Sequence, residues 1–405
     1  MTLAPPLPLA EAQARLLSEV EPLATETVAA EAAAGRYLAE PVLAARTQPA
    51  ADLSAMDGYA LRADDVTGPW RVIGESAAGH PYGGRIARGE ALRISTGGLM
   101  PPGDGVVLLQ EDAARDGDRL ALGGAKARRG EPSARHVRRA GFDFREGDEV
   151  LAAGVRIGPA QLALALAAGR ARLPVRALPS LAVLDSGEEL AADPAACAPC
   201  QIPASNGAML AAMAAPFAGS IARLGPVPDR LDAMLAALGK AADADVIVTS
   251  GGASVGDHDL VRPALEQWGA RIDFWRVAMR PGKPLLVARR GRQWVIGLPG
   301  NPVSSYVTAF MFLLPLLRAL GGARAPMPRG VTMRLGSALP AVGDRTEFVR
   351  ARLEGDSLVS VVEQDSSALA ALARADALIE RAANAPAAEA EALVRAYWLE
   401  NGGVA

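Results

Sequence analysis

The spacing of hydrophobic positions changes along the chain and predicts different structures in different stretches. Between residue 179 and about residue 321, apolar runs of strand length alternate with amphipathic stretches of helical length. Strands are expected at 181–184, 220–224, 245–249, 274–277, 285–288 and 294–298, and helices at 205–215, 229–242, 259–268 and from 302 onward. This alternation is typical of a doubly wound, mainly parallel sheet in an α/β domain.

The stretches before this region predict helices and a β-rich domain. Residues 9–20 and 26–38 both show a helical pattern, with Gly35 near the end of the second. From 46 to about 143, glycine and proline are frequent and the apolar runs shorten to strand length, which predicts a β-rich domain. A further helix is expected from Pro159 to Ala168, because proline suits the first turn of a helix.

Two other stretches complete the prediction. From residue 324 onward, short alternating runs indicate a small β domain. The most apolar stretch, 303–317, is predicted to be a buried helix and not a membrane span. Polar side chains occupy its first turns, Pro315 interrupts it, and it falls short of the roughly 20 residues that a bilayer requires.

Composition narrows the classes of function. The 405 residues predict several domains, and the net charge of −3 argues against binding to nucleic acid or to anionic membranes. The first ten residues lack the basic and apolar segments of an export signal, so a cytoplasmic location is expected. Cys197 and Cys200 form a single C-x-x-C pair, which cannot complete a four-ligand zinc site. We interpret this pair as part of a loop rather than as a redox motif.

The loop TSGGASVGDHDL, residues 249–260, carries the strongest chemical signal. It follows a short apolar run, and Gly251 and Gly252 allow the main chain to approach a phosphate or oxyanion closely. Asp257 and Asp259 offer the hard oxygen ligands that suit a divalent cation such as Mg²⁺. The alternative is an ordinary strand-to-helix turn with Asp259 as the helix cap.

Four further polar loops also follow apolar runs of the predicted sheet. They are SGEE (186–189), PVPD (226–229), RPGKP (280–284) and LPGNP (298–302). Ligands of open α/β sheets bind outside the carboxyl ends of the strands. We therefore expect most of these loops to gather at that edge and to form one site.

A second chemical signal lies in the predicted β-rich domain. Asp57 stands in the stretch SAMDGYALR beside Gly58, between a turn and a strand. Its spacing alone favours a structural turn acid with local hydrogen bonds.

Seven stretches, taken together and in order, resemble the MoeA family, the molybdopterin molybdenumtransferases that also include the E-domain of gephyrin. They are SAMDGYA, ISTGGLMPPGDGVV, VRRAGFDFREGD, SGEEL, TSGGASVGDHD, RPGKP and GLPGNPVS. The resemblance covers essentially the whole chain. It implies four parts: an elongated segment domain (1–45 and 144–178), a β-rich domain with the MDGYA motif (46–143), a molybdopterin-binding α/β domain (179–323) and a C-terminal β barrel (324–405).

The resemblance also implies an activity and its partners. The expected reaction inserts molybdenum from molybdate into adenylylated molybdopterin and releases AMP, with Mg²⁺ present. A homodimer is expected, with the site formed between the α/β domain of one subunit and the β-rich domain of the other. Transient contacts with the molybdopterin adenylyltransferase and with proteins that handle the finished cofactor are expected as well.

The implied site residues fall into three groups. The catalytic candidates are Asp57, Asp143, Glu189 and Asp229. The expected cation ligands are Asp257, Asp259 and Glu188, because acids near an anionic substrate require a bridging metal or carry protons. The substrate-binding candidates are Gly251, Gly252, Ser254, Arg280, Lys283, Pro299, Asn301, Pro302, Ser304 and Asn206. Helix capping by Asn206 and a first-turn hydrogen bond of Ser304 are the alternatives for those two residues.

The chain departs from the family pattern at two places. Glu188 replaces a usual aspartate, and Ala204 stands where the family usually has an acid. The missing acid supports an alternative function, a paralogue that binds molybdopterin or molybdate with weak or no transferase activity. A receptor-clustering scaffold and an adenylyltransferase are less favoured, because the chain has no appended second domain but does contain the MDGYA motif.

Overall fold

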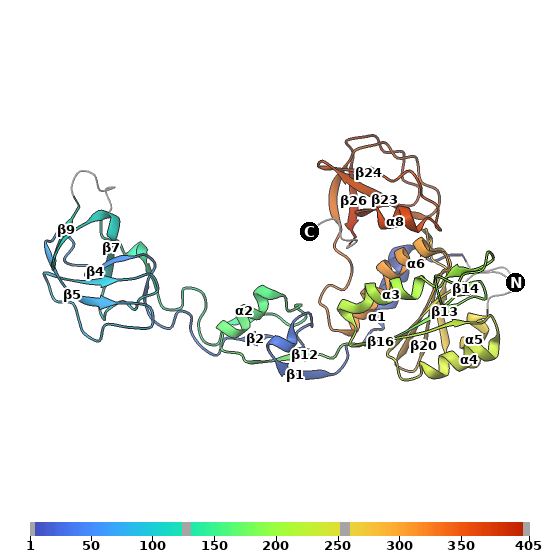
Figure 1. The fold of residues 1–405 in the computed structure, drawn as a ribbon, viewed down its shortest axis with the longest axis horizontal. Coiled ribbons are helices and arrows are strands. Elements are labelled where there is room, and N and C mark those ends of the chain that lie inside the picture. Colours follow the sequence, from blue (N-terminus) through green and yellow to red (C-terminus); the bar gives the residue numbers. More distant parts are fainter. Residues whose placement is uncertain (1–4, 124–130, 252–259, 400–405) are drawn as a thin grey trace.

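The structure is a computed structural model that describes residues 5–123, 131–251 and 260–399. The chain is elongated, and its helices and strands form four groups (Figure 1). A β-rich group lies at one end, an α/β group and a C-terminal barrel lie at the other, and a narrow group of short ladders connects them.

The α/β group is built on a six-stranded sheet in the order β16-β13-β17-β21-β20-β18. Its strands are β13 (Ser180–Ser186), β16 (Ser220–Val227), β17 (Val246–Ser250), β18 (Arg271–Trp275), β20 (Leu286–Arg290) and β21 (Gln293–Leu298). The first four strands in this order are parallel, whereas β20 is antiparallel to both of its neighbours. The prediction of a mainly parallel sheet is confirmed.

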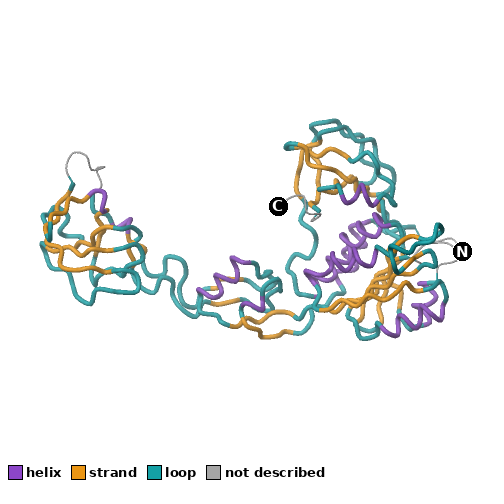
Figure 2. Tube along the Cα trace, in the orientation of Figure 1, coloured by secondary structure: helices purple, strands orange, loops and turns teal. Residues whose placement is uncertain are grey.

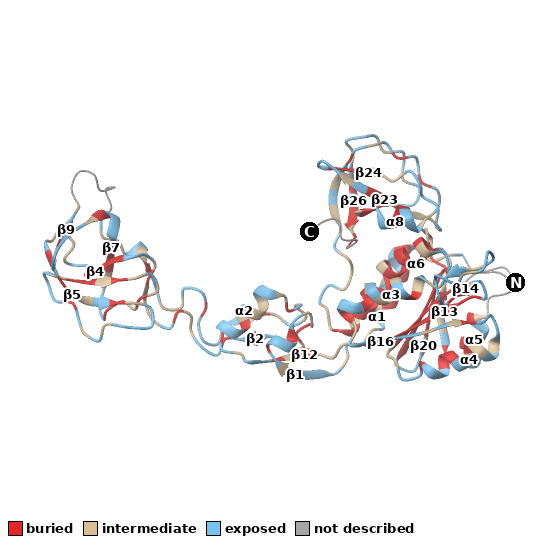
Figure 3. Ribbon diagram, in the orientation of Figure 1, coloured by how far each residue is buried: buried red, intermediate tan, exposed pale blue. Residues whose placement is uncertain are grey.

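Helices cover both faces of this sheet (Figure 2). They are α1 (Leu9–Ser18), α3 (Asn206–Ala214), α4 (Leu231–Lys240), α5 (Val261–Gln267), α6 (Pro302–Thr308) and α7 (Leu314–Leu320). Because side chains alternate along a strand, Leu181 and Val183 pack toward α1, α3 and α6–α7, whereas Ala182 and Leu184 pack toward α4 and α5. The sheet is therefore doubly wound, and its central strands β13, β17 and β21 are buried on both faces (Figure 3).

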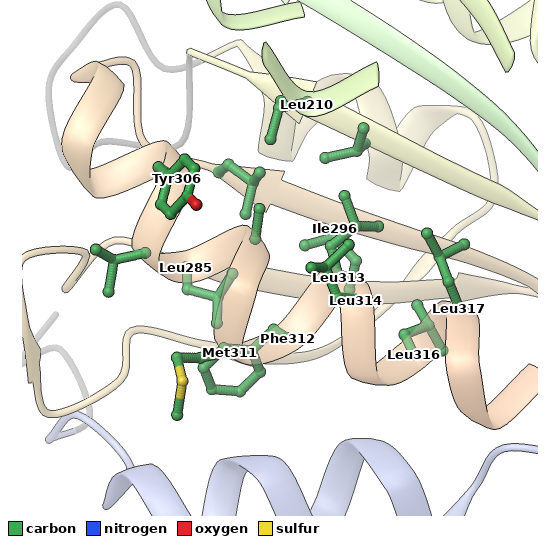
Figure 4. Packing of buried hydrophobic residues seen from close by; sticks show 14 of the residues in the cluster. Leu210, Leu285, Ile296, Tyr306, Met311, Phe312, Leu313, Leu314, Leu316 and Leu317 are labelled. Carbon is green, nitrogen blue, oxygen red and sulfur yellow. The ribbon is translucent and has the colours of Figure 1, made fainter. Parts of the chain in front are cut away.

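The apolar stretch that starts at Pro302 is a buried helix, as predicted. Helices α6 and α7 are joined by a π-helical turn, Ala309–Leu313, in which Leu313 lies beside Ile296 of the sheet and Met311 and Phe312 point away from it (Figure 4). The wider π turn precedes Pro315, which has no N–H to donate to the preceding turn. Residues 302–320 are long and apolar enough to cross a bilayer, but 83% of an 18-residue stretch of this helix is buried inside the protein.

The β-rich group contains a six-stranded sheet in the order β7-β4-β6-β5-β9-β8. Its strands are β4 (Gly58–Arg62), β5 (Trp70–Ser76), β6 (Glu90–Ile94), β7 (Gly105–Leu109), β8 (Ala113–Asp116) and β9 (Arg119–Leu122), and β3 (Leu53–Ser54) pairs separately with β10 (Val137–Arg138). The predicted β character of this region is confirmed.

The connecting group contradicts one helix prediction. Residues 26–38 do not form a helix, because β1 (Thr25–Ala29) pairs antiparallel with β12 (Arg172–Arg176) and only a 3₁₀ turn, Glu31–Ala33, follows. Thr25, Thr27 and Val28 are β-branched and suit a strand once a partner is present. The predicted helix after Gly158 is confirmed as α2 (Pro159–Ala167), and β2 (Val42–Leu43) pairs with β11 (Glu149–Leu151).

The C-terminal group is a small closed barrel. Its strands are β22 (Val331–Leu335), β23 (Thr346–Glu354), β24 (Ser357–Ser360), β25 (Ala377–Arg381) and β26 (Leu393–Trp398). Pairing of β23 with β25 closes the ring, and the helix α8 (Leu369–Ala373) precedes β25. Phe348 and Tyr397 extend the core of the α/β group into the barrel, so these two groups share one apolar cluster.

Replacement of Gly282 with alanine is expected to destabilise the α/β group by about 2–4 kcal/mol. Gly282 has φ +105°, and an added Cβ would lie 2.3 Å from Cγ2 of Thr308. Gly269→Ala is the control, since Gly269 has φ +88° with open space around it and should cost only about 1 kcal/mol. Urea unfolding followed by tryptophan fluorescence measures both losses. Equal losses for the two variants would contradict the predicted steric contact.

Candidate functional site

The polar loops lie at one edge of the central sheet. The loops that follow β13, β16, β17 and β21 share this edge because these strands are parallel. The RPGKP stretch reaches the same edge, because β18 runs in the same direction as β21 and the stretch lies between the end of β18 and the start of β20. We call this edge the rim, and the topology agrees with the prediction that most of the polar loops follow strands that end there.

Glycines bring three of the rim loops into direct contact. Gly251 has φ +94°, and a Cβ there would lie 2.3 Å from the carbonyl oxygen of Ser186. A Cβ on Gly300 would lie 3.6 Å from Cα of Gly251, and the backbone N–H of Gly251 donates to Leu298 O at 3.2 Å. The positive φ and the close approach to Ser186 explain the glycine at position 251. The other candidates of this loop, Gly252, Ser254, Asp257 and Asp259, lie outside the described residues.

Asn206 connects three elements of the rim. It is the first residue of α3, and its Nδ2 donates to Oγ of Ser250 at 2.9 Å and to the carbonyl oxygen of Gly300 at 2.7 Å. The side chain therefore joins α3 to the ends of β17 and β21. It does not cap its own helix, which was the alternative.

Acidic side chains line the rim beside β13 and β16. Asp229 accepts hydrogen bonds from Oγ of Ser186 at 3.2 Å and from the backbone N–H of Glu188 at 3.4 Å. The carboxylate of Glu189 lies over Gly187, where an added Cβ would be 2.5 Å from Oε2. The structure thus brings Glu188, Glu189 and Asp229 together at the ends of two neighbouring strands. Within the described ranges, no group of three or more metal-ligating side chains is close enough to hold an ion.

The RPGKP stretch is held between the helix α6 and the barrel. Gly282 packs against Thr308, and the backbone O of Lys283 accepts hydrogen bonds from Val277 and Leu285 at 3.0 Å. Arg280, at the end of β19 (Met279–Arg280), pairs with Glu347 of the barrel at 3.1 Å. Lys283 is exposed, so its ammonium is accessible to an anion in solvent.

The barrel also holds the PGNP loop. Asn301 donates to Oγ of Ser366 at 2.8 Å, and Ser366 O accepts from the backbone N–H of Val303 at 3.0 Å. Arg350 is only 1% exposed and donates to the carbonyl oxygens of residues 363 and 365, which fixes the loop that carries Ser366. Sequence analysis did not identify Ser366 or Arg350, because both act through long-range contacts.

The remaining PGNP candidates are mostly enclosed. Pro299 is buried and Pro302 is the half-buried first residue of α6. Ser304 is 5% exposed, and its carbonyl oxygen accepts from Oγ1 of Thr308 at 2.6 Å. These residues shape the wall of the rim.

Asp57 is held by a residue far from it in sequence. Its Oδ1 accepts from the backbone N–H of Thr96 at 2.7 Å and from Oγ1 of Thr96 at 3.0 Å. These two hydrogen bonds lower the pKa of the exposed Asp57 carboxyl, so it is a carboxylate at neutral pH. Asp57 is thus more than a local turn acid. The sequence motifs did not single out Thr96, although it lies in the stretch ISTGGLMPPGDGVV.

Asp57 and the rim lie at opposite ends of the chain. Asp57 precedes β4 in the β-rich group, whereas the rim belongs to the distant α/β group (Figure 1). Asp143 is exposed, and its backbone N–H donates to Gln48 O at 3.0 Å beside the bridge that joins Gln48 to Phe144. The structure therefore separates Asp57 and Asp143 from the rim candidates within one chain.

Asp185 is a rim acid that sequence analysis missed. It is the next-to-last residue of β13 and is 5% exposed, and its Oδ2 accepts from the backbone N–H of Gly207 at 3.1 Å. Burial raises the pKa of Asp185 to about 6, against the opposing effects of Arg223 and of the Gly207 hydrogen bond. Its signal in the sequence was an acid at the end of an otherwise apolar strand.

Three family models match the chain in order. The MoeA N-terminal region (domain I and II) matches residues 7–169, a probable molybdopterin binding domain matches 182–319, and the MoeA C-terminal region (domain IV) matches 332–398. A Bacillus subtilis protein named molybdopterin molybdenumtransferase is 33% identical over 92% of this chain and 90% of its own length. A Nostoc protein of the same name is 35% identical over 80% of this chain and 76% of its own length.

A solved structure is similar over nearly the whole chain. The crystal structure of a molybdopterin biosynthesis MoeA protein from Pyrococcus horikoshii matches with a TM-score of 0.82 at 25% identity, and the match covers 98% of this chain and 100% of that chain. All four groups of elements therefore have counterparts in one protein.

Asp185→Asn is expected to stabilise the protein at neutral pH but not in acid. Because burial raises the pKa of Asp185 in the folded protein from its ordinary value of 3.8 to about 6, folding takes up a proton between these pH values, and the charged carboxylate destabilises the fold above about pH 6. Its removal should increase the free energy of unfolding by about 2 kcal/mol at pH 7.5 and by little at pH 4. Urea unfolding at both pH values measures this, with Asp243→Asn at an exposed site as control. A gain that is independent of pH would contradict the prediction.

Proposed function

Because the chain belongs to the MoeA family, we propose that it is a molybdopterin molybdenumtransferase, which inserts molybdenum from molybdate into adenylylated molybdopterin and releases AMP. The observation that carries this proposal is the gathering of five polar loops at one rim, in a chain whose relatives of that name align over most of their length. The loops carry the groups that an anionic substrate requires.

The rim suits the binding of oxyanions. Gly251 and Gly300 place backbone without side chains where two loops meet, and glycine-rich backbone allows an oxyanion to approach closely. Arg280 and Lys283 supply positive charge on a loop whose Gly282 packs against α6. The Arg280 guanidinium is already oriented by Glu347, and the exposed Lys283 ammonium provides a point charge for molybdate or phosphate.

The acids of the rim suit a hard divalent cation. We assign Mg²⁺ to Glu188 together with Asp257 and Asp259, because carboxylate oxygens are the ligands that Mg²⁺ prefers. Of this set the structure describes Glu188, whose backbone N–H donates to the carboxylate of Asp229 at 3.4 Å. When bound, the cation would neutralise charge on the phosphates of the substrate. Glu189 and Asp229 would orient the substrate and carry protons.

The site is proposed to form between two chains of a homodimer. Asp57 and its partner Thr96 lie at the far end of the molecule from the rim (Figure 1). A second chain in a two-fold arrangement would supply Asp57 to the rim of the first, and the first chain would do the same in return. In this arrangement Asp57 acts on the cation or on a proton during metal insertion, and Asp143 adds a second acid from the same chain as Asp57.

The alternative of a binding paralogue is not favoured, because relatives at 33% and 35% identity that match most of the chain are named transferases. The rim also retains Asn206 with its contacts, despite the alanine at 204. We further propose a cytoplasmic enzyme that contacts the adenylyltransferase and the cofactor-handling proteins only transiently.

Asp57→Asn is expected to reduce the formation of the molybdenum cofactor by about 10² or more, because the amide removes the negative charge while keeping the size of the side chain. Binding of adenylylated molybdopterin should change little, since its contacts come mainly from the α/β group. Single-turnover release of AMP and incorporation of molybdenum, with and without molybdate and Mg²⁺, measure the effect. Near-normal incorporation would return Asp57 to a purely structural role.

Mixed dimers of Asp57→Asn and Lys283→Ala chains are expected to recover activity that neither variant has alone. Lys283→Ala should weaken substrate affinity at least tenfold by removing a charge-assisted contact, so it is nearly inactive at low substrate concentration. In a mixed dimer, one site combines an intact rim with an intact Asp57. A statistical mixture should therefore reach about a quarter of wild-type activity.

The two chains are co-expressed with different tags, and the resulting dimers are assayed at a substrate concentration below the wild-type Kd. Each variant co-expressed with itself is the control. If isolated mixed dimers recover no activity, the site is not shared between chains. A protein that light scattering shows to be a monomer and that has full wild-type activity would also contradict a shared site.

A further inference from the structure

The buried acid Asp185 is connected to the substrate loops of the rim through the start of α3. We propose that Asp185 is a positioning residue that supplies, from β13, the cap of helix α3 and thereby holds Asn206 in place for substrate binding. This inference rests on the proposed function for its kinetic consequence, but its structural part stands on contacts that are measurable without substrate.

Asp185 contacts the start of α3 through a hydrogen bond and a close steric approach. The carboxylate Oδ2 accepts from the backbone N–H of Gly207, the second residue of the helix, at 3.1 Å. A Cβ on Gly207 would lie 2.1 Å from that oxygen and 2.9 Å from Cγ of Asp185. Position 207 must therefore be glycine as long as the carboxylate is present.

The helix has no cap of its own. Ser205 precedes α3 and makes no side-chain hydrogen bond to the helix, and Ala204 has no acceptor in its side chain. A capping side chain normally accepts from the second or third N–H of a helix, and a negative charge there interacts favourably with the helix dipole. Asp185 does both from the neighbouring strand.

Asp185 is linked to the rim in two ways, through its carboxylate and through its place in β13. Asp185 pairs in register with Ser250 across β13 and β17. Ser250 in turn accepts from Asn206, which also donates to Gly300 O at 2.7 Å. A shift of the first turn of α3 would therefore break the contacts that join the ends of β17 and β21. Among the described residues, Oδ1 of Asp185 has no hydrogen-bond partner and is buried, so burial of this acid is not explained by a second internal contact.

Loss of this cap should affect substrate binding more than the chemical step, because the acidic and basic side chains of the rim belong to other loops and keep their positions. We expect Asp185→Ala to raise KM for adenylylated molybdopterin about fivefold or more, with kcat within about twofold. Asp185→Asn keeps an oxygen acceptor and should raise KM less. Asp243→Ala, which replaces an exposed acid before β17, is the matched control. An unchanged KM in a folded Asp185→Ala protein would overturn the positioning role.

A double-mutant cycle tests the contact without any assay of activity. Gly207→Ala should lower the midpoint of thermal unfolding by several degrees in the native background, because the new Cβ meets the carboxylate. In the Asp185→Ala background the same change should be neutral or stabilising, since alanine favours a helix over glycine. Gly239→Ala in α4, where a Cβ meets open space, should be stabilising in both backgrounds.

The two readouts separate the inference from the proposed function. Equal effects of Gly207→Ala in both backgrounds would refute the contact, whatever the enzyme does. A reversal of sign with an inactive wild-type protein would refute the transferase function and leave the cap of α3 in place. A reversal of sign together with a raised KM supports both.

Discussion

The burial of both faces of the central sheet is the constraint on which the candidate site depends. Strands β13 and β17 run parallel, so the chain between them must cross over through helices, and helices cover these strands on each side. Parallel strands end at one edge, and that edge collects the glycine-rich and charged loops. Short-range contacts, such as those of Asn206 with Ser250 and Gly300, only adjust distances between loops that the topology has already gathered.

The C-terminal barrel helps to hold the loops of the rim in place. It shares an apolar cluster with the α/β group through Phe348 and Tyr397, and its buried Arg350 holds the loop whose Ser366 binds Asn301 and the start of α6. The β-rich group is instead separated from the rim by narrow ladders (Figure 1). One chain therefore has two polar regions that its fold keeps apart, which is the physical basis for proposing a site shared between two chains.

The carboxylate of Asp185 lowers the stability of the fold but holds the first turn of α3 in place. Burial raises its pKa to about 6, so at neutral pH the protein keeps a carboxylate that the apolar interior disfavours. A residue that costs stability is retained where a function needs it. Here the carboxylate holds the N–H of Gly207, and the helix that it caps carries Asn206 into the rim.

The sequence alone determined the local structure and the chemistry of the loops. Apolar periodicity predicted the sheet, its helices, α2 and the buried helix after Pro302, because periodicity reflects which side of an element is buried. The motifs predicted Asp57, Asn206 and Lys283 as site residues. The tertiary structure decided the rest. Residues 26–38 failed as a helix because β1 pairs with β12, and the contacts of Thr96, Asp185 and Ser366 join segments far apart in the chain. A local sequence pattern cannot predict such contacts, because they depend on how distant segments pack together.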